Sequence, residues 1–268
     1  MIHIAVCVKQ IQDPEIPSAL LRVDEATNTM RLATGASPVM SPFDEQAVEA
    51  ALRIREALGE AKITAITLGE ETARQVLKAA LSLGADQGVL LSDPVCQNGD
   101  SYATALTLGQ AIEKLGDVDL ILAGRQAADL DAGVVGCGLA ELLDIPAITF
   151  AGKVAVENGM VRVDRVIEDG YEIQEAPLPA LVTISHEIGP ARKASLRETM
   201  RAARKPITAW SAADLGLDAG QVGASGSRRA VERLYIPTSE IVCEFIPGAA
   251  ADEMARNLAR RLFEANVL

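Results

Sequence analysis

The stretch 124–136, GRQAADLDAGVVG, contains the residues of this chain that are best suited to bind a ligand. It joins an apolar run at 118–123, typical of a strand buried on both faces, to a run with helical spacing at 133–143. The first turn of a helix offers unpaired backbone N–H groups and the positive end of the helix dipole. A strand that leads into such a turn is a common setting for phosphate binding.

Two glycines and two aspartates of this stretch suit a nucleotide. Gly133 and Gly136 have no Cβ, so a phosphate group could approach the backbone closely there. Asp131 is placed to cap the helix, and Asp129 is placed to accept a ribose hydroxyl. The stretch therefore predicts a nucleotide-binding loop. An ordinary strand-to-helix turn is the alternative, because such turns favour the same residue types.

The sequence contains no known motif for catalysis by side chains. No serine stands in a GxSxG sequence, and no GxxxxGK[ST] loop occurs. His3 and His186 are the chain's 2 histidines and are expected to be structural, and they do not make a usual zinc site. The 4 cysteines follow no CxxC or His-paired spacing, which favours reduced, structural thiols. We expect no catalytic residues and no metal site.

The stretches that must position this loop alternate between strands and helices. Expected strands lie at 2–8, 63–68, 88–91 and 118–123, and expected helices at 42–58, 70–83 and 101–115. This alternation predicts an α/β fold with a doubly wound, mainly parallel, Rossmann-like sheet. Ligands of such sheets bind beyond the carboxyl ends of the strands, where the winding reverses. Lys9, Leu68, Ser92 and the loop after residue 123 are expected at that edge.

The chain before and after these units is less regular. Residues 20–23 and 29–32 are expected to pair as a hairpin, and the sequence SPFD predicts a helix start with Ser41 as cap and Asp44 reaching back. After residue 143 a strand at 145–150 is followed by an antiparallel extension. Its expected strands lie at 153–156, 160–166 and 171–175, before a core strand at 181–184.

The last third of the chain is expected to reach outward. The stretch 190–206 has 6 basic residues against 1 acid, which is typical of a solvated helix face or of a docking loop. Small residues at 211–227 indicate a linker, and a strand at 241–246 and a helix at 249–263 follow it. We expect three parts: an α/β nucleotide-binding domain at 1–189, a basic docking loop and helix at 190–210, and a linker with a C-terminal arm at 211–268.

Composition excludes several classes of function. Aromatic residues make up only 3% of the 268 residues, so the core must be built from Ala, Val, Leu and Ile, as layered α/β folds allow. The net charge of -12 opposes attraction to nucleic acid and to anionic lipid. The sequence contains no apolar run of membrane-spanning length and starts without a leader pattern. We expect a cytoplasmic protein that does not insert into a membrane.

Five stretches in order together resemble the β subunit of electron transfer flavoproteins, the ETF β or FixA-like family. They are VKQ with Asp13 at 8–13, SPFDEQAVEAA at 41–51, ALSLGAD at 80–86, GRQAADLD at 124–131, and PALVT at 179–183 with ASLR at 194–197. The resemblance covers roughly residues 4–207 and implies a nucleotide-binding fold of the adenine nucleotide α-hydrolase-like type. It also implies an obligatory α subunit that holds most of a redox FAD.

The resemblance further implies a nucleotide in this subunit. In most members it is a structural AMP, whereas electron-bifurcating members hold a second FAD there and accept electrons from NADH. The residues matched to that site are Cys7, Ser41, Phe43, Asp44, Leu68, Ala127, Asp131, Gly133, Val134, Val135 and Gly136. Phe43 is also expected near the flavin of the α subunit. The family often has Asn, Gln and Thr at 133–135 and an acid at 130. This chain lacks those side chains, so only backbone groups remain to contact a phosphate. We expect AMP, with FAD as the alternative.

Partners follow from the same resemblance. Leu196 is expected to insert into a flavin dehydrogenase of the acyl-CoA type, with Arg192, Lys193 and Arg197 tuning the encounter. Electrons would then pass to a membrane quinone oxidoreductase, and the arm would pack on the α subunit. We expect a carrier subunit rather than a stand-alone enzyme, with enzymatic NADH oxidation only if the protein is bifurcating. The rival hypotheses are an enzyme, either a bifurcating complex that oxidises NADH or an adenylate-forming protein of the same broad fold, and a nucleotide sensor without flavin.

Overall fold

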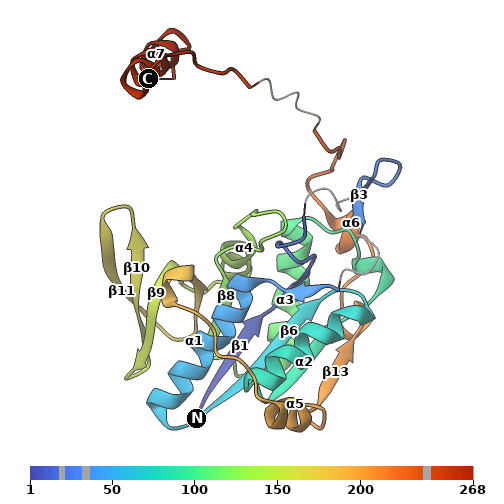
Figure 1. The fold of residues 1–268 in the computed structure, drawn as a ribbon. Coiled ribbons are helices and arrows are strands. Elements are labelled where there is room, and N and C mark those ends of the chain that lie inside the picture. Colours follow the sequence, from blue (N-terminus) through green and yellow to red (C-terminus); the bar gives the residue numbers. More distant parts are fainter. Residues whose placement is uncertain (18–21, 32–36, 238–242, 268) are drawn as a thin grey trace.

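The computed structural model describes residues 1–17, 22–31, 37–237 and 243–267. Its centre is a 9-stranded sheet (Figure 1). Across the sheet the strands are β11 (Gly170–Pro177), β10 (Met160–Ile167), β9 (Ala147–Glu157), β12 (Ala180–Ile184), β8 (Leu120–Gly124), β1 (Ile2–Cys7), β6 (Ala61–Leu68), β7 (Gln87–Leu91) and β13 (Ile207–Trp210). All neighbours from β9 to β13 run parallel, whereas β10 pairs antiparallel with both β9 and β11. The predicted α/β fold is confirmed.

Helices cover both faces of the parallel part. Successive residues of a strand point to opposite faces, and in β1 Ile4 and Ala5 belong to separate core clusters. The cluster around Ile4 includes α1 (Pro42–Leu58), α2 (Arg74–Leu83) and α5 (Leu196–Ala202). The cluster around Ala5 includes α3 (Ser101–Leu115) and α4 (Val135–Leu142). The sheet is therefore doubly wound, as the alternation of elements predicts.

The winding reverses between β1 and β8. From β1 the chain proceeds to β6 and β7 on one side, and it then returns to place β8 on the other side of β1. The carboxyl ends of β1, β6 and β8 lie at one edge of the sheet, because these strands pair in parallel register. This edge is where a doubly wound sheet binds ligands.

Several short elements complete the body. β2 (Gln10–Ile11) pairs with β5 (Val39–Met40), and β3 (Arg22–Asp24) pairs with β4 (Thr29–Arg31). The predicted hairpin is thus confirmed at 22–24 and 29–31, while residues 20, 21 and 32 lie outside the described residues. α2 begins later than predicted, because residues Glu71–Ala73 form a 3-10 turn (η2) before it. The other 3-10 turns are η3 (Pro94–Cys96), η4 (His186–Ile188) and η5 (Ala213–Leu215), and α6 (Gly223–Gly226) is a short α-helix.

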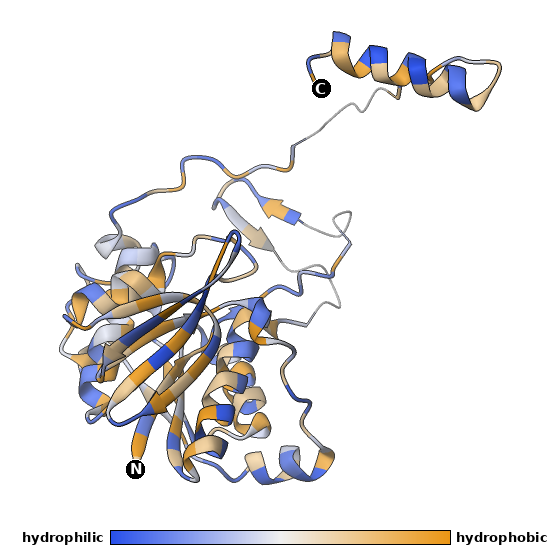
Figure 2. Ribbon diagram, turned by 90° about the vertical axis from the view of Figure 1, so that its left-hand side faces the viewer, coloured by the Kyte–Doolittle hydropathy of each residue, from blue (hydrophilic) through white to orange (hydrophobic). Residues whose placement is uncertain are grey.

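The antiparallel extension follows the sequence closely. β10 and β11 have the predicted places, and the two strands predicted at 145–150 and 153–156 are one strand, β9, of 11 residues. Hydrophobic and hydrophilic residues alternate along these twisted strands (Figure 2). β9 is irregular where its register with β12 shifts between Val182 and Ile184. This irregularity lies next to the ligand edge.

The linker interpretation of residues 211–227 is wrong. Ala212, Leu215, Leu217 and Val222 are buried in the cluster that contains α3. Before them, β13 adds an edge strand to the sheet beside β7, which the sequence analysis did not predict. Apolar side chains spaced among the small residues give this segment enough surface to bury, so it belongs to the α/β body.

The chain leaves the body beyond this segment. α7 (Ala251–Glu264) has no buried residue and lies apart from the body in both views (Figures 1 and 2). It starts within two residues of its predicted start. Of the strand predicted at 241–246, residues 241 and 242 lie outside the described residues, and 243–246 form no strand. Among the described residues, no helix is long and apolar enough to cross a membrane.

Candidate nucleotide site and docking helix

The start of α1 directs the carboxylate of Asp44 across the point where the winding reverses. Asp44 Oδ2 accepts a hydrogen bond from the Lys9 backbone N–H (2.8 Å), just after β1, and Oδ1 accepts one from the N–H of Gly124 (3.1 Å), the last residue of β8. The capping role predicted for Asp44 is therefore wrong. Ser41 occupies the N-cap position of α1 without a side-chain capping bond. One buried carboxylate instead holds the exits of two neighbouring strands together.

Burial controls the protonation of this site. Burial raises the pKa of Asp44 to about 7, and the N–H groups of Lys9 and Gly124 oppose that rise only in part. Burial likewise raises the pKa of the neighbouring Cys7 thiol to about 12, and the charge of Asp44 adds to the effect. A thiol with such a pKa stays protonated, so Cys7 can line a ligand site but is a poor nucleophile.

The loop after β8 is attached to the loop after β1. Lys9 Nζ lies 2.9 and 2.7 Å from the two carboxylate oxygens of Asp129. The hydroxyl of Ser41, which is buried, accepts a hydrogen bond of 3.4 Å from the Ala128 N–H. The predicted site residues Ser41 and Asp129 thus lie together. Asp129 binds an ammonium group, and its carboxylate keeps lone pairs that can accept a ribose hydroxyl.

Asp131 does not cap α4 as predicted. Its backbone is left-handed, with φ of 49°, and its carboxylate accepts a hydrogen bond of 2.7 Å from Gln126 Nε2. α4 starts at Val135 with Val134 in the N-cap position and no side-chain cap. The N–H of Gly138, bonded to Val134 O at 2.9 Å, is the first in the helical pattern. The N–H groups of the first turn before it are the donors that a helix start offers to an anion.

The two glycines of the loop have different roles. Gly133 is exposed and left-handed, with φ of 65°, so it suits a backbone that bends toward a ligand. Gly136 is buried, and a Cβ there would lie 2.8 Å from Thr183 Cγ2 on β12. The missing Cβ of Gly136 therefore faces the sheet, and the phosphate role of its backbone stays a prediction. Its missing side chain lets α4 pack closely on the sheet.

An arginine between two aromatic rings flanks the same edge. The guanidinium carbon of Arg125 lies 5.0 Å from the ring centre of Phe43 and 5.7 Å from that of Phe150. Phe150 has a φ of 58°, a left-handed conformation that is rare for a bulky residue, and 41% of it is exposed. Arg125 and Phe150 were not predicted as site residues. No local sequence signal marks Phe150, because its orientation depends on the irregular pairing of β9.

The remaining predicted residues lie around this edge without recorded polar contacts of their side chains. Cys7 is in register with Ile66, two residues before Leu68, so the ends of β1 and β6 present both to the same side. Ala127 is half-buried in the loop, and Val134 is exposed in front of α4. Within the described residues, no group of 3 or more His, Cys, Asp or Glu residues could hold a metal ion.

The basic stretch forms a short exposed helix. α5 begins after Ser195, which caps it in a capping box with Glu198. Leu196 is 79% exposed and Met200, one turn later, is 67% exposed. Lys193 and Arg197 are exposed as well. Arg192 differs from them, since Glu49 and Glu56 of α1 bind its guanidinium group, so it does not fit the predicted role of a free encounter charge.

Comparisons with known proteins show which proteins this chain is similar to. Residues 29–215 match the family model described as the electron transfer flavoprotein domain. A protein of Acetobacterium woodii named caffeyl-CoA reductase-Etf complex subunit CarD is 35% identical over 99% of this chain and 100% of its own length. The electron transfer flavoprotein subunit beta of Thermoanaerobacterium thermosaccharolyticum is 37% identical over 99% and 100%. Protein FixA of Azorhizobium caulinodans is 32% identical over 97% and 94%.

The chain belongs to the electron transfer flavoprotein family. It is an electron transfer subunit of the ETF β or FixA type. ETF β subunits pair with an α subunit, and the family is associated with flavin and nucleotide. The residues at the β1 and β8 exits fit a phosphate group, because they combine an ammonium group, helix-start N–H groups and a left-handed glycine.

Proposed function

We propose that this ETF β subunit binds AMP as a structural ligand at the edge between β1 and β8. One observation carries the proposal: α4 begins at Val135 with no side-chain cap, directly after the left-handed Gly133. An uncapped helix start leaves N–H donors and positive potential for a phosphate group. Lys9 adds a positive charge to the same edge, and Asp129 has acceptor capacity for ribose. The redox FAD is then held mainly by the α subunit.

A second FAD in place of AMP is the alternative, and one observation favours it. The stack of Phe43, Arg125 and Phe150 presents a partly exposed aromatic ring at this edge of the sheet, and flat rings pack well against such a surface. A subunit with FAD there would accept electrons from NADH in an electron-bifurcating complex. AMP remains the proposed ligand, because the loop presents one helix start and one lysine, enough for a single phosphate group.

Ligand extraction separates these two assignments. The chain is co-expressed with its α subunit, the purified heterodimer is denatured, and the released nucleotides are separated by chromatography and counted against protein. One AMP and one FAD per heterodimer support the proposal. Two FAD and no AMP establish the alternative, with NADH then expected to reduce the heterodimer. A heterodimer with one FAD and no nucleotide in this subunit would refute both.

We also propose that α5 docks on a flavin dehydrogenase that acts on CoA thioesters. Leu196 and Met200 form an exposed apolar pair on one face of α5, and Lys193 and Arg197 surround it with positive charge in a chain whose net charge is -12. The name of the CarD relative, a subunit of a caffeyl-CoA reductase complex, supports this partner class. From the docked dehydrogenase, electrons pass to the α-subunit flavin and on to a quinone oxidoreductase, in the cytoplasm.

The docking role is tested by Leu196→Ala in the heterodimer. The variant should reduce the rate of electron transfer from the dehydrogenase roughly tenfold, because truncating a central apolar anchor costs more than 1 kcal/mol of binding. Reduction of the same flavin by dithionite, which needs no docking, should keep its rate. An unchanged rate with the dehydrogenase would contradict the proposal.

A further inference from the structure

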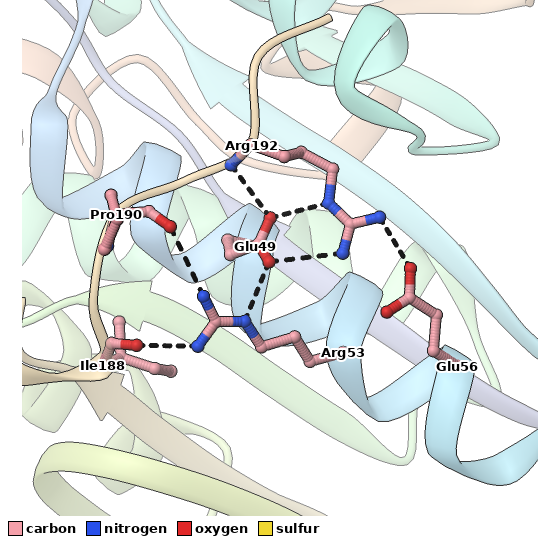
Figure 3. A network of polar contacts seen from close by, with 6 residues as sticks. All are labelled: Glu49, Arg53, Glu56, Ile188, Pro190 and Arg192. Atoms are coloured by element: carbon pink, nitrogen blue, oxygen red, sulfur yellow. Dashed lines mark hydrogen bonds and ion pairs between the residues drawn. The ribbon is translucent and has the colours of Figure 1, made fainter.

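A buried carboxylate of α1 holds the segment that leads into α5 (Figure 3). Glu49 is only 5% exposed. Its carboxylate accepts hydrogen bonds from Arg192 Nε (2.7 Å), from Arg192 Nη2 (3.2 Å) and from the backbone N–H of the same residue (3.1 Å). Both the side chain and the main chain at position 192 are therefore fixed to α1.

Glu49 also orients a second arginine toward the same segment. Arg53 Nε donates to Glu49 (2.8 Å), and its two terminal nitrogens donate to the carbonyl oxygens of Ile188 (2.7 Å) and Pro190 (3.3 Å) (Figure 3). Three of the five residues at 188–192 are thus bonded to α1 through one carboxylate and the two guanidinium groups around it.

The two acids that bind Arg192 differ in their surroundings. Burial alone would raise the pKa of Glu49, but the hydrogen bonds from Arg192 and Arg53 outweigh burial and hold that pKa below its ordinary value. Glu56 lies 2.6 Å from Arg192 Nη1, but its side chain is 61% exposed. Exposed ion pairs contribute little, whereas a buried carboxylate with several charge-assisted donors constrains its partners strongly.

The other end of the segment is also attached. Lys205 Nζ donates to the carbonyl oxygens of Leu81 (3.0 Å) and Ala85 (2.6 Å) at the end of α2. The exposed Leu196 and Met200 lie between these two attachment points. The segment is therefore a span fixed at both ends, with its apolar pair facing outward.

We propose that Glu49 is a positioning residue for docking, which sets the place of Leu196 by fixing Arg192 four residues before it. The inference rests on the proposed docking role of Leu196. Glu49 does not touch the partner. It removes conformational freedom from the docking segment before the complex forms, so less ordering is needed on association. Weakening the Glu49–Arg192 contact should impair binding to the dehydrogenase while electron transfer inside the complex stays unchanged.

The test compares Glu49→Gln with Glu56→Gln in the heterodimer. Both variants remove one negative charge next to Arg192, but only the first removes the buried anchor. With the dehydrogenase as donor, Glu49→Gln should raise the KM for the heterodimer roughly fivefold and leave kcat within about twofold, since ground-state organisation is lost and not chemistry. Glu56→Gln should change KM by less than about twofold. Equal effects of the two variants, or a fall in kcat alone, would overturn the proposal.

Two further measurements keep the test decisive. Arg192→Gln removes the same contact by changing the exposed partner, so it should raise KM as Glu49→Gln does. It keeps the test possible if Glu49→Gln folds poorly. If Glu49 acts through Leu196, the double variant Glu49→Gln/Leu196→Ala should be less than additive, whereas additivity would refute that route. If Leu196→Ala itself has no effect, the docking function fails. A clear effect of Leu196→Ala without one of Glu49→Gln or Arg192→Gln leaves docking intact and refutes the positioning role alone.

Discussion

Asp44 and Gly124 approach each other so closely that no other residue fits at position 124. A carboxylate oxygen of Asp44 accepts the hydrogen bond of the Gly124 N–H, and a Cβ on Gly124 would lie 2.5 Å from that oxygen. The same Cβ would lie 2.7 Å from the Cβ of Phe43. Glycine at the end of β8 therefore lets the start of α1 lie across the exits of two strands. Three separate parts of the sequence meet there.

Asp44 should make the folded protein less stable as the pH rises. Its folded pKa of about 7 lies above the value of an unfolded aspartate, about 3.9, so the folded state favours the protonated form. This stabilisation is fully present below about pH 4 and is lost as the pH rises through 7. Asp44→Asn cannot titrate, so its free energy of unfolding should depend less on pH between pH 5 and 8. Urea unfolding of both proteins measures this, and parallel profiles would contradict it.

Gly136→Ala should destabilise the protein without removing its nucleotide. The new Cβ would meet Thr183 at 2.8 Å, and overpacking of this kind costs about 1 to 3 kcal/mol. Gly138→Ala, in the same helix, is the matched control, because its Cβ would lie at an ordinary 3.6 Å from Ala105. Replacing that helical glycine should be neutral or stabilise by up to about 1 kcal/mol. Thermal unfolding measures both, and nucleotide lost from folded Gly136→Ala would show that the missing Cβ also serves phosphate binding.

Lys9→Gln should weaken nucleotide binding more than folding. The ion pair with Asp129 is partly exposed and contributes at most about 1 kcal/mol to stability. A lost charge-assisted contact to phosphate, by comparison, lowers affinity roughly tenfold. The heterodimer is stripped of ligand and titrated with AMP by calorimetry. Lys62→Gln, on a lysine at the start of β6 and away from the carboxyl edge, is the control. Equal affinity of Lys9→Gln and the parent would remove Lys9 from the site.

Local sequence rules predicted most of the fold, because strands such as β1 and β8 and helices such as α1 and α3 have periodicities that their neighbours do not alter. The rules failed where tertiary contacts determine whether a segment forms a strand or is buried. β13 is short and exists because β7 offers it an edge. Residues 212–222 have the composition of a linker, yet Leu215, Leu217 and Val222 are buried.

For the candidate site, the position of the residues could be predicted better than their bonding partners. The meeting of the loop after β8 with the other strand exits could be predicted, since parallel strands bring their carboxyl ends to one edge. That a nucleotide binds there stays a prediction. Asp44 has the spacing of a capping box, but its carboxylate binds Lys9 and Gly124, which are distant in sequence. Arg192 belongs to a basic run and binds Glu49, 143 positions away. Partners of that kind are set by the packing of helices and loops, which no local pattern encodes.

The exposed charges around Leu196 should affect the association rate with the dehydrogenase and its dependence on salt. Arg192 should not. Lys193→Gln and Arg197→Gln each remove an exposed charge, so they should slow association with the dehydrogenase and reduce its dependence on salt. Arg192→Gln should instead weaken binding by a factor that changes little with salt, because its role is intramolecular. Stopped-flow measurements between about 20 and 300 mM salt, a range over which the Debye length falls severalfold, distinguish the two classes. The same salt slope for all three variants would contradict this distinction.

Removing the chain after Pro237 should abolish pairing with the α subunit while the α/β body stays folded. We propose that the segment beyond it is the arm that packs on that subunit. α7 has no buried residue, and Phe245 is 88% and Phe263 72% exposed, as expected for side chains that a partner covers. A stable obligate interface buries upward of roughly 2,000 Å² in total, and an extended arm supplies such an area with few residues.

Two truncations separate an arm from a part of the core. The chain ending at Pro237 keeps Asn28 bonded to the Glu232 carbonyl (3.2 Å) and to the Leu234 N–H (2.9 Å), so its circular dichroism should match that of a folded α/β body. The chain ending at Trp210 loses the buried Leu215, Leu217 and Val222 and should unfold or aggregate. Co-purification with a tagged α subunit and the flavin content are then measured for the first truncation. A flavin-loaded heterodimer of normal stability without residues 238–268 would show that α7 is not the arm.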